Sequence, residues 1–299
     1  MTNFRTGHLI SLVLLIVMMV HACSPMRQVA ELSQRADVAY ESGNFEEAHA
    51  LYAQLIDAYR AQNQEIDGLV YRRAGVAAHA VGDKQQAIEY LEFARHTPAA
   101  DEQTFFILAQ AYREIDNLSR EISNLERYAQ KYPDGEKIAE VQERLFITLV
   151  ESLNWQQAKD LWPDLADRAY HNEELLTGYL RALRQLDDKD TAGDIAEMIL
   201  EINANNKEAL DYLGREHFNA AVNLYNREMR AYEENRTHRQ YAQLLEAFEI
   251  INTDFRIALN YFLRLYEQDP RPEYASFLAN IYERFQDEEK ARYYRQKAN

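Results

Sequence analysis

Apolar side chains recur along most of the chain at the three- and four-residue spacing of amphipathic helices. The spacing is clearest over 68–98, where Gly82 separates two apolar faces and the Asp83 carboxylate can cap the second helix. Pro98 ends the pattern, because helices end at or before the residue that precedes a proline. This stretch therefore predicts two short antiparallel helices joined by a tight turn. Their matching faces comprise Tyr71, Ala74, Gly75, Ala78, Ala87, Leu91 and Ala94.

The same arrangement is predicted repeatedly, because an Asn or Asp that can cap a second helix recurs along nearly the whole chain. In all but one case an alanine follows four residues later, where the two helices would approach most closely. A single helical pair cannot bury its own apolar face, so the recurrence predicts stacked neighbours. The expected capping residues are Asn44, Asp83, Asn117, Asn154, Asp188, Asp254 and Asp287.

This pattern resembles the tetratricopeptide repeat (TPR), a helix–turn–helix unit of about 34 residues. The match includes the Ala74-Gly75 pair, Gly82 in the turn and the closing Pro98. The resemblance implies an all-α protein whose repeats stack into a right-handed α-α superhelix. Composition agrees with an all-helical chain, because only 9 glycines and 6 prolines occur in 299 residues.

The repeat pattern changes along the chain. We expect about five hairpins over 29–206, one long helix over 207–238, and further hairpins with a closing capping helix over 239–299. The long helix is expected because no helix breaker stands before Asn235. Thr237 is the expected cap of the next helix, which Asp254 would separate from its partner helix.

Two of the repeats depart from the small-residue pattern. Glu121 replaces the small residue of the third repeat, so this pair of helices is expected to splay or to shift register. In the fourth repeat, Pro163 is expected to kink the helix after Trp162. Trp155 and Trp162 lie seven residues apart on one helical face. They could form a ligand platform, but packing around an irregular joint is the favoured interpretation.

The N-terminal segment has the features of a targeting sequence. Residues 9–20 are apolar except for Ser11, and they are too few to span a bilayer, which takes about 20 residues in a helix. They suit the hydrophobic region of a secretory signal. Val20, Ala22 and Cys23 resemble a bacterial lipobox, from which His21 departs.

The lipobox resemblance implies that 1–22 is a cleaved signal peptide, that Cys23 carries the lipid, and that 23–28 is a tether. The alternative is an ordinary signal with an incidental cysteine. In such lipoproteins, Ser24 after the cysteine implies sorting to the outer membrane, whereas an aspartate there implies inner-membrane retention. The expected location is therefore the periplasmic face of the outer membrane.

Charge narrows the range of partners. The formal net charge is −16, and residues 23–299 hold 32 basic against 49 acidic residues, a net charge of −17. Such a surface repels phosphate backbones and anionic headgroups, so we expect no nucleic-acid binding and membrane attachment only through the lipid. Cys23 is the only cysteine, which excludes an intrachain disulfide and a cysteine-based metal cluster.

The sequence shows no motif for catalysis or for cofactor binding. A Gly-rich phosphate loop, a nucleophile elbow and a His-Glu-x-x-His zinc motif are all absent from it. The histidines downstream of Cys23 do not pair at a four-residue spacing, and adjacent carboxylates point in different directions on a helix. We therefore expect no enzymatic activity, no cofactor, no metal and no small-molecule substrate.

The TPR resemblance implies a concave groove, lined by the first helix of each repeat, that binds an extended peptide or a helix of a partner protein. Arginine and aromatic residues are prominent among the matching positions, so we expect an acidic or C-terminal peptide. The alternative is that the arginines pair with glutamates one turn away. The Lys and Asn pair of carboxylate-clamp members is absent. The matching positions are Asp37, Tyr40, Arg72, Val76, His79, Phe106, Gln110, Arg113, Ile147, Thr177, Arg181 and Arg184.

These expectations describe a non-enzymatic, lipid-anchored TPR scaffold of the cell envelope. The C-terminal part, 228–285, resembles that of uncharacterised TPR lipoproteins from Bacteroidota-type bacteria. A narrower alternative is a BamD-like factor of outer-membrane protein assembly. An alternative of another class is an accessory lipoprotein of a SusD-like glycan-uptake system, although such proteins are longer and have a binding region that this chain lacks.

Overall fold

The hairpin expected over 68–98 is present in the computed structural model, which describes residues 27–298. Its helices are α3 (Gly68–Ala80) and α4 (Lys84–Ala94). The Asp83 carboxylate accepts the backbone N–H of Gln86 at 3.0 Å and so caps α4. A Cβ on Gly75 would lie 2.5 Å from Cγ of Leu91, so the absence of a side chain allows α3 to contact α4.

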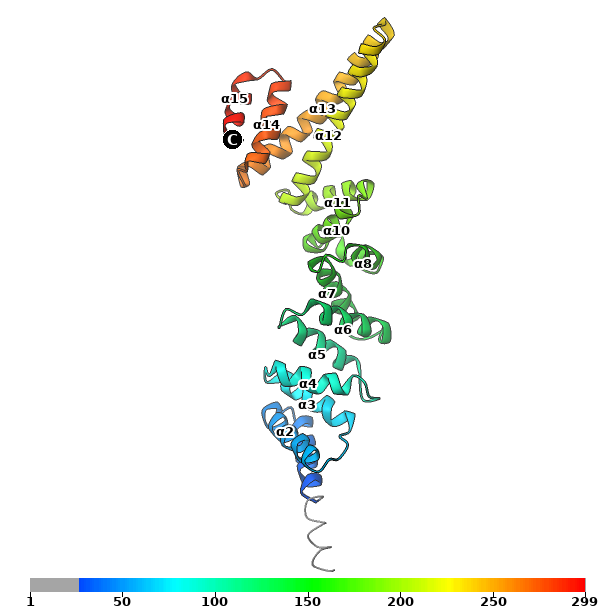
Figure 1. Ribbon diagram of the computed structural model, residues 1–299, viewed down its shortest axis with the longest axis vertical. Coiled ribbons are helices and arrows are strands. Elements are labelled where there is room, and N and C mark those ends of the chain that lie inside the picture. Colours follow the sequence, from blue (N-terminus) through cyan, green and yellow to red (C-terminus); the bar gives the residue numbers. More distant parts are fainter. Residues whose placement is uncertain (1–26, 299) are drawn as a thin grey trace, which may run out of the picture. The chain divides into compact units, whose positions relative to one another are not determined.

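The chain forms two compact units. The first unit ends at Thr148, and the second begins at Leu149. In the first unit, successive helices pair and stack in sequence order (Figure 1). Their buried faces form cores of Ala, Leu, Ile and Tyr side chains. The helices are one over 27–41, α2 (Phe45–Ala61), α3, α4, α5 (Glu102–Arg113), α6 (Leu118–Lys131) and the first part of α7 (Ile138–Glu151).

Glu121 shows how the third repeat tolerates an acid at a small-residue position. Its side chain is only 1% exposed, and Arg144 of α7 binds it through two nitrogens, with Nε···Oε1 at 2.6 Å and Nη2···Oε2 at 3.3 Å. A buried carboxylate needs such a partner, because removing an unpaired charge from water costs several kcal/mol. The ion pair thus takes the place of a small-residue contact.

The second unit begins with an irregular repeat. The helix that starts at Trp155 ends at Leu161, one residue before the kink expected after Trp162, and Pro163 lies in the 3₁₀ turn that follows. Trp162 is buried and stacks on Tyr179 of α10, with 4.0 Å between ring centroids and 6° between planes. This contact supports the packing interpretation of Trp162. The elements are α8 (Trp155–Leu161), η1 (Trp162–Asp164), α9 (Ala166–Ala169), α10 (Glu173–Gln185) and α11 (Lys189–Ile202).

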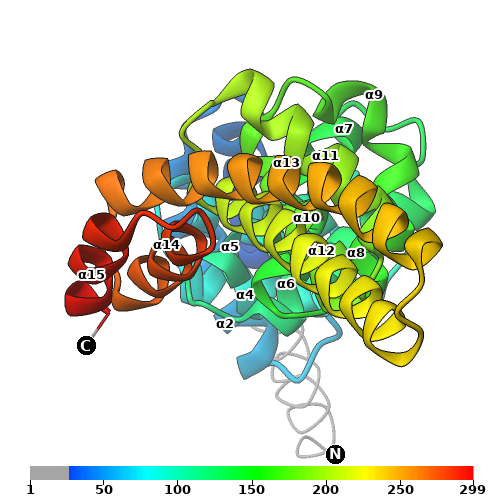
Figure 2. The same ribbon diagram turned by 90° about the horizontal axis from the view of Figure 1, so that it is seen from above.

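Two long antiparallel helices follow, α12 (Lys207–Glu234) and α13 (His238–Gln268), and they lie side by side in both views (Figures 1 and 2). The long helix predicted after residue 206 and the Thr237 cap are confirmed, since the Thr237 hydroxyl accepts the N–H of Gln240 at 3.2 Å. The unit ends with α14 (Pro272–Arg284) and α15 (Glu288–Lys297).

The helix boundary expected at Asp254 is wrong, because α13 continues through this residue as one helix of 31 residues. An unbroken apolar stripe at spacings of three and four holds the helix together across 252–254. The Asp254 carboxylate binds His217 Nδ1 of α12 at 2.8 Å instead of capping a helix. The stripe consists of Leu244, Ala247, Ile251, Phe255, Ala258, Phe262 and Leu265.

Two further expectations concern membranes and metals. The signal peptide, Cys23, Ser24 and most of the tether lie outside the described residues. Within residues 27–298, no helix is both long and apolar enough to cross a membrane. The same part of the chain contains no group of three or more His, Cys, Asp or Glu side chains placed to hold a metal ion.

Candidate functional site

Three of the residues expected in a groove line one pocket of the first unit. His79 comes from α3, and Phe106 and Gln110 come from successive turns of α5. The pocket has a volume of about 490 Å³. Its other lining residues are Asp101, Glu102, Gln103, Ile107, Tyr128, Glu136 and Lys137.

The wall of this pocket is built by the loop that follows α6. The Tyr128 hydroxyl donates to Oε2 of Glu102 at 3.0 Å and accepts the backbone N–H of Lys137 at 3.1 Å. A Cβ on Gly135 would lie 2.7 Å from this hydroxyl and 2.8 Å from the Glu102 oxygen, so only glycine lets the loop pass this close. Burial raises the pKa of Tyr128 above its usual value.

The start of α5 forms the opposite part of the lining. The Asp101 side chain accepts the N–H of Thr104 at 3.0 Å, and the Thr104 hydroxyl oxygen accepts the backbone N–H of Asp101 at 3.2 Å. This capping box orients the first turn of α5, which carries Glu102 and leads to Phe106. The ring of Phe106 meets Tyr128 at 6.4 Å between centroids. The pocket therefore combines aromatic rings with carboxylates.

The charge of the pocket is negative. Asp101 is paired with Arg72, and Lys137 lies 3.6 Å from Glu140, so these charges are neutralised by their own neighbours. Glu102 and Glu136 have no ion pair among the described residues. Two uncompensated carboxylates attract a cation and repel an anion. This lining does not suit the acidic peptide that the sequence led us to expect.

The expected groove arginines are largely occupied by acids of the chain itself. Arg72 binds Asp101, and Arg181 binds Glu208 through two nitrogens, with Nε···Oε2 at 2.8 Å. Arg184 reaches Asp211 at 3.3 Å. The alternative of local pairs with glutamates one turn away is therefore wrong for these three arginines, although each of them is paired. The acids belong to the next helix pair, 27 to 29 residues further along the chain.

Other groove positions have different surroundings. Arg113 is exposed, whereas Val76 is 4% exposed and belongs to the apolar core with Leu91. The ring of Tyr40 lies edge-on to Phe45 at 5.8 Å, with the Arg73 guanidinium 5.4 Å from its centroid. Burial raises the pKa of Tyr40. Thus Tyr40 and Val76 serve packing, while Arg113 remains available to a partner.

A network beside Tyr40 was not expected from the sequence. Asp37 Oδ1 accepts the Tyr52 hydroxyl and an Nη1–H of Arg73, both at 2.6 Å. Burial and the hydrogen bond to Asp37 raise the pKa of Tyr52. Asp37 therefore ties the helix over 27–41 to α2 and α3, which is a structural role.

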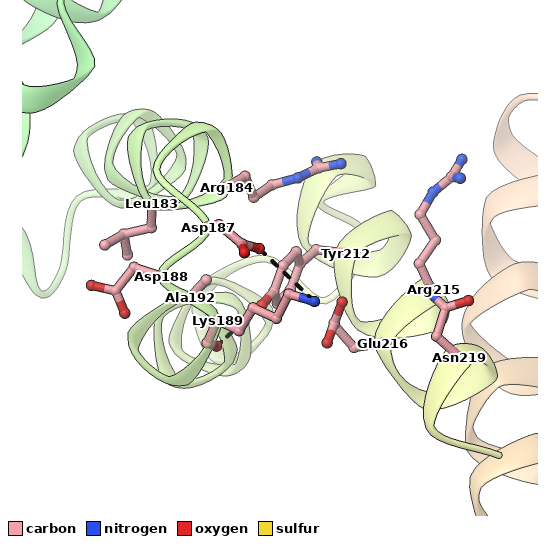
Figure 3. A pocket seen from close by; sticks show the side chains of 10 residues that line it. All are labelled: Leu183, Arg184, Asp187, Asp188, Lys189, Ala192, Tyr212, Arg215, Glu216 and Asn219. Carbon is pink, nitrogen blue, oxygen red and sulfur yellow. Dashed lines mark hydrogen bonds and ion pairs between the residues drawn. The ribbon is translucent and has the colours of Figure 1, made fainter. Parts of the chain in front are cut away.

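A smaller pocket of about 190 Å³ lies where α12 follows α11 in the second unit (Figure 3). The Tyr212 hydroxyl donates to the backbone oxygen of Lys189 at 3.1 Å, and burial raises the pKa of Tyr212 to about 12. Most of its charged side chains are paired, for example Lys189 with Asp187 at 3.9 Å and Arg215 with Asp211 at 2.7 Å, and the three basic and three acidic side chains of the lining balance in number. This pocket is a neutral joint between helices.

The sequence alone missed Glu102, Tyr128, Glu136 and Lys137 as pocket residues. The groove positions of the repeat lie on first helices, whereas Tyr128 is on a second helix and 136–137 follow it. The signal available in the sequence was the turn Pro133-Asp134-Gly135, which ends α6 and returns the chain toward α5.

The sequence matches no protein-family model and no curated protein. Among solved structures, a candidate protein-binding protein from Bacteroides ovatus is similar with a TM-score of 0.51 at 18% identity, over 74% of this chain and 99% of that chain. YrrB, a TPR protein with an unusual peptide-binding site, has a TM-score of 0.45 at 13% identity, over 59% and 87%. MamA has a TM-score of 0.43 at 16% identity, over 59% and 92%. The helical pairs and the first of these likenesses together show that the chain has the all-α superhelical fold of TPR proteins.

Proposed function

We propose that this chain is a non-enzymatic TPR scaffold that holds a partner protein in the pocket between α3, α5 and α6. The observation that carries the proposal is the convergence of His79, Phe106 and Gln110 with Tyr128 around a pocket of about 490 Å³. An open pocket with aromatic rings and hydrogen-bonding groups suits a protruding side chain of a partner, since aromatic anchors dominate protein interfaces.

The partner segment presents a lysine or arginine to this pocket. Glu102 and Glu136 supply uncompensated negative charge, and charge-assisted hydrogen bonds are about twice as strong as neutral ones. The faces of Phe106 and Tyr128 add a site for a cation near an aromatic ring. The Lys137 ammonium group lies 5.9 Å from the Phe106 centroid, which supports a cation-binding role for this ring.

A photo-crosslinking experiment in the native envelope tests this function. A benzophenone side chain at Gln110 is expected to capture a partner protein, whereas the same group at Gln85, an exposed residue at the start of α4, captures none. The double change Glu102→Gln and Glu136→Gln keeps the acceptor for Tyr128, and it should lower capture about tenfold by removing the charge. Equal capture at Gln110 and Gln85 would refute the proposed site.

The scaffold is attached to the periplasmic face of the outer membrane through a lipid on Cys23. The support is the sequence alone: a twelve-residue apolar run, a lipobox-like ending and a single cysteine directly after it. A lipid anchor would hold the TPR fold at a membrane surface, even though its net charge of −16 disfavours binding to anionic headgroups.

Substituting Cys23 tests the anchor. Cys23→Ser is expected to abolish incorporation of labelled palmitate and to leave the unprocessed precursor, because the thiol is the acceptor of the lipid. Ser24→Asp is the matched variant: labelling should persist, while the protein moves from the outer- to the inner-membrane fraction. Undiminished labelling of Cys23→Ser would contradict the anchor, and an unchanged fraction for Ser24→Asp would contradict the sorting.

The captured partner also distinguishes two narrower roles. Subunits of the outer-membrane insertion machinery would favour a BamD-like assembly factor. A TonB-type transporter would favour an accessory lipoprotein of a SusD-like glycan-uptake system. The broader role as a scaffold is common to both.

A further inference from the structure

The antiparallel pair formed by α12 and α13 has an apolar face that α14 covers only in part. Phe277 of α14 packs edge-on against Phe218 of α12, with 4.9 Å between ring centroids. Arg284, the last residue of α14, lies over the rings of Tyr225 and Phe248, at 3.9 Å and 5.4 Å from their centroids. The far half of the α12–α13 pair extends beyond α14 and α15 in both views (Figures 1 and 2).

Past Arg284, the apolar face continues without a covering helix among the described residues. We call it the tip face and define it as Tyr232, Tyr241 and Leu245. Tyr241 and Leu245 are 50% and 46% exposed, one turn apart on the flank of α13 that also carries Phe248. Tyr232 of α12 meets Tyr241 at 5.9 Å between ring centroids. Contiguous exposed apolar surface of this kind marks an interaction site.

The charge around the tip face permits a second copy of the chain to approach. Residues 227–249 contain four arginines and five glutamates, a net charge of −1, whereas the whole chain carries −16. Two acidic chains repel each other over most of their surface, but little at this tip. The arginines are Arg227, Arg230, Arg236 and Arg239, and the glutamates are Glu228, Glu233, Glu234, Glu246 and Glu249.

The charges around the tip face are also arranged so that two copies of it could match opposite charges. The turn between the two helices carries Arg236, and α13 begins with His238, whereas Glu249 lies farther along α13. Along the sequence of α13, His238 and Glu249 lie at nearly equal distances before and after the midpoint between Tyr241 and Leu245. A two-fold axis through this midpoint would place the basic turn of one copy beside Glu249 of the other, and would pack each Tyr241 near the other Leu245.

We propose that the tip face is a homodimer interface, in which two copies pack their α12–α13 pairs against each other antiparallel. In the resulting four-helix arrangement, the second copy covers the part of the α12–α13 pair that α14 leaves uncovered. The interface lies on other helices than the partner pocket of α3, α5 and α6. A dimer would therefore present two such pockets to its partners.

Sedimentation of the full chain in detergent matched to the buffer density tests the dimer. The wild type is expected to show a monomer–dimer equilibrium, and Tyr241→Glu with Leu245→Glu should raise its dissociation constant at least about tenfold. Ile250→Glu is the matched control, because Ile250 is 58% exposed on the same helix but on its other flank. A monomeric wild type, or an equal effect of the control, would overturn the proposal.

A charge exchange tests the two-fold arrangement itself. Arg236→Glu and Glu249→Arg should each weaken the dimer by about three- to tenfold, because each places like charges together. The two changes in one chain should restore the wild-type dissociation constant. Failure of the combined variant to recover would overturn the proposed arrangement, since damage to folding from two substitutions would accumulate rather than cancel.

Discussion

Arg144→Ala is expected to lower the free energy of unfolding by about 3–5 kcal/mol, because it leaves a buried carboxylate without its cation. Glu121 is only 1% exposed, and Arg144 binds both of its oxygens. The acid could be relieved only by taking up a proton or by opening α6 to water. Urea unfolding followed by circular dichroism at pH 7 measures the change.

Glu121→Ala is the control for this prediction. It restores the alanine that most repeats carry at this position, so it should cost much less than Arg144→Ala. Combining the two changes should recover most of the stability that Arg144→Ala loses, because no buried charge then remains unpaired. Additive losses in the double variant would show that the pair does not act as argued.

Phe262→Ala is expected to cost about 3–5 kcal/mol of unfolding free energy through the cavity that it leaves. Phe262 is fully buried in α13 and stacks on Phe277 of α14, with 4.3 Å between centroids and 2° between planes. It also meets Tyr274 at 6.3 Å. The ring thus joins the long helical pair to the last hairpin, and urea unfolding should report its loss.

Gly214 provides a sharper measurement of the same contact. A Cβ on Gly214 of α12 would lie 3.1 Å from Cζ of Phe262, so Gly214→Ala by itself crowds the ring. This crowding offsets the gain in helix propensity of about 1 kcal/mol that alanine brings over glycine. In the Phe262→Ala background the crowding is absent, and Gly214→Ala should be stabilising. A Gly214→Ala effect of the same size in both backgrounds would contradict the contact.

Local signals predicted individual helices well where they were strong. The Gly82-Asp83 turn, the Thr237 cap and the break at Pro163 each depend on the conformation of one or two residues, which the residue type itself restricts. Asp254 shows the limit of such signals. An aspartate can cap a helix, but the apolar stripe from Leu244 to Leu265 continues on both sides of it, and burial of that stripe keeps α13 intact.

The site was predictable only in part for a similar reason. The repeat pattern placed His79, Phe106 and Gln110 on the correct helices, because positions within a repeat are local. It could not predict that Arg72 and Arg181 would be neutralised by acids of the next helix pair, since that contact depends on how repeats stack. Because the sequence analysis did not include these ion pairs, it led us to expect a positive groove, whereas the pocket lining is negative.

The sequence by itself determined the all-α TPR architecture, since helix periodicity, caps and small residues at crossings act over a few residues. The tertiary structure decided which charges remain available. It paired Arg72 with Asp101 and Arg144 with Glu121, and it left Glu102 and Glu136 uncompensated in the pocket. The physical reason is that these ion pairs join side chains 23 and 29 residues apart in the sequence, which only the stacking of helices brings within a few ångströms.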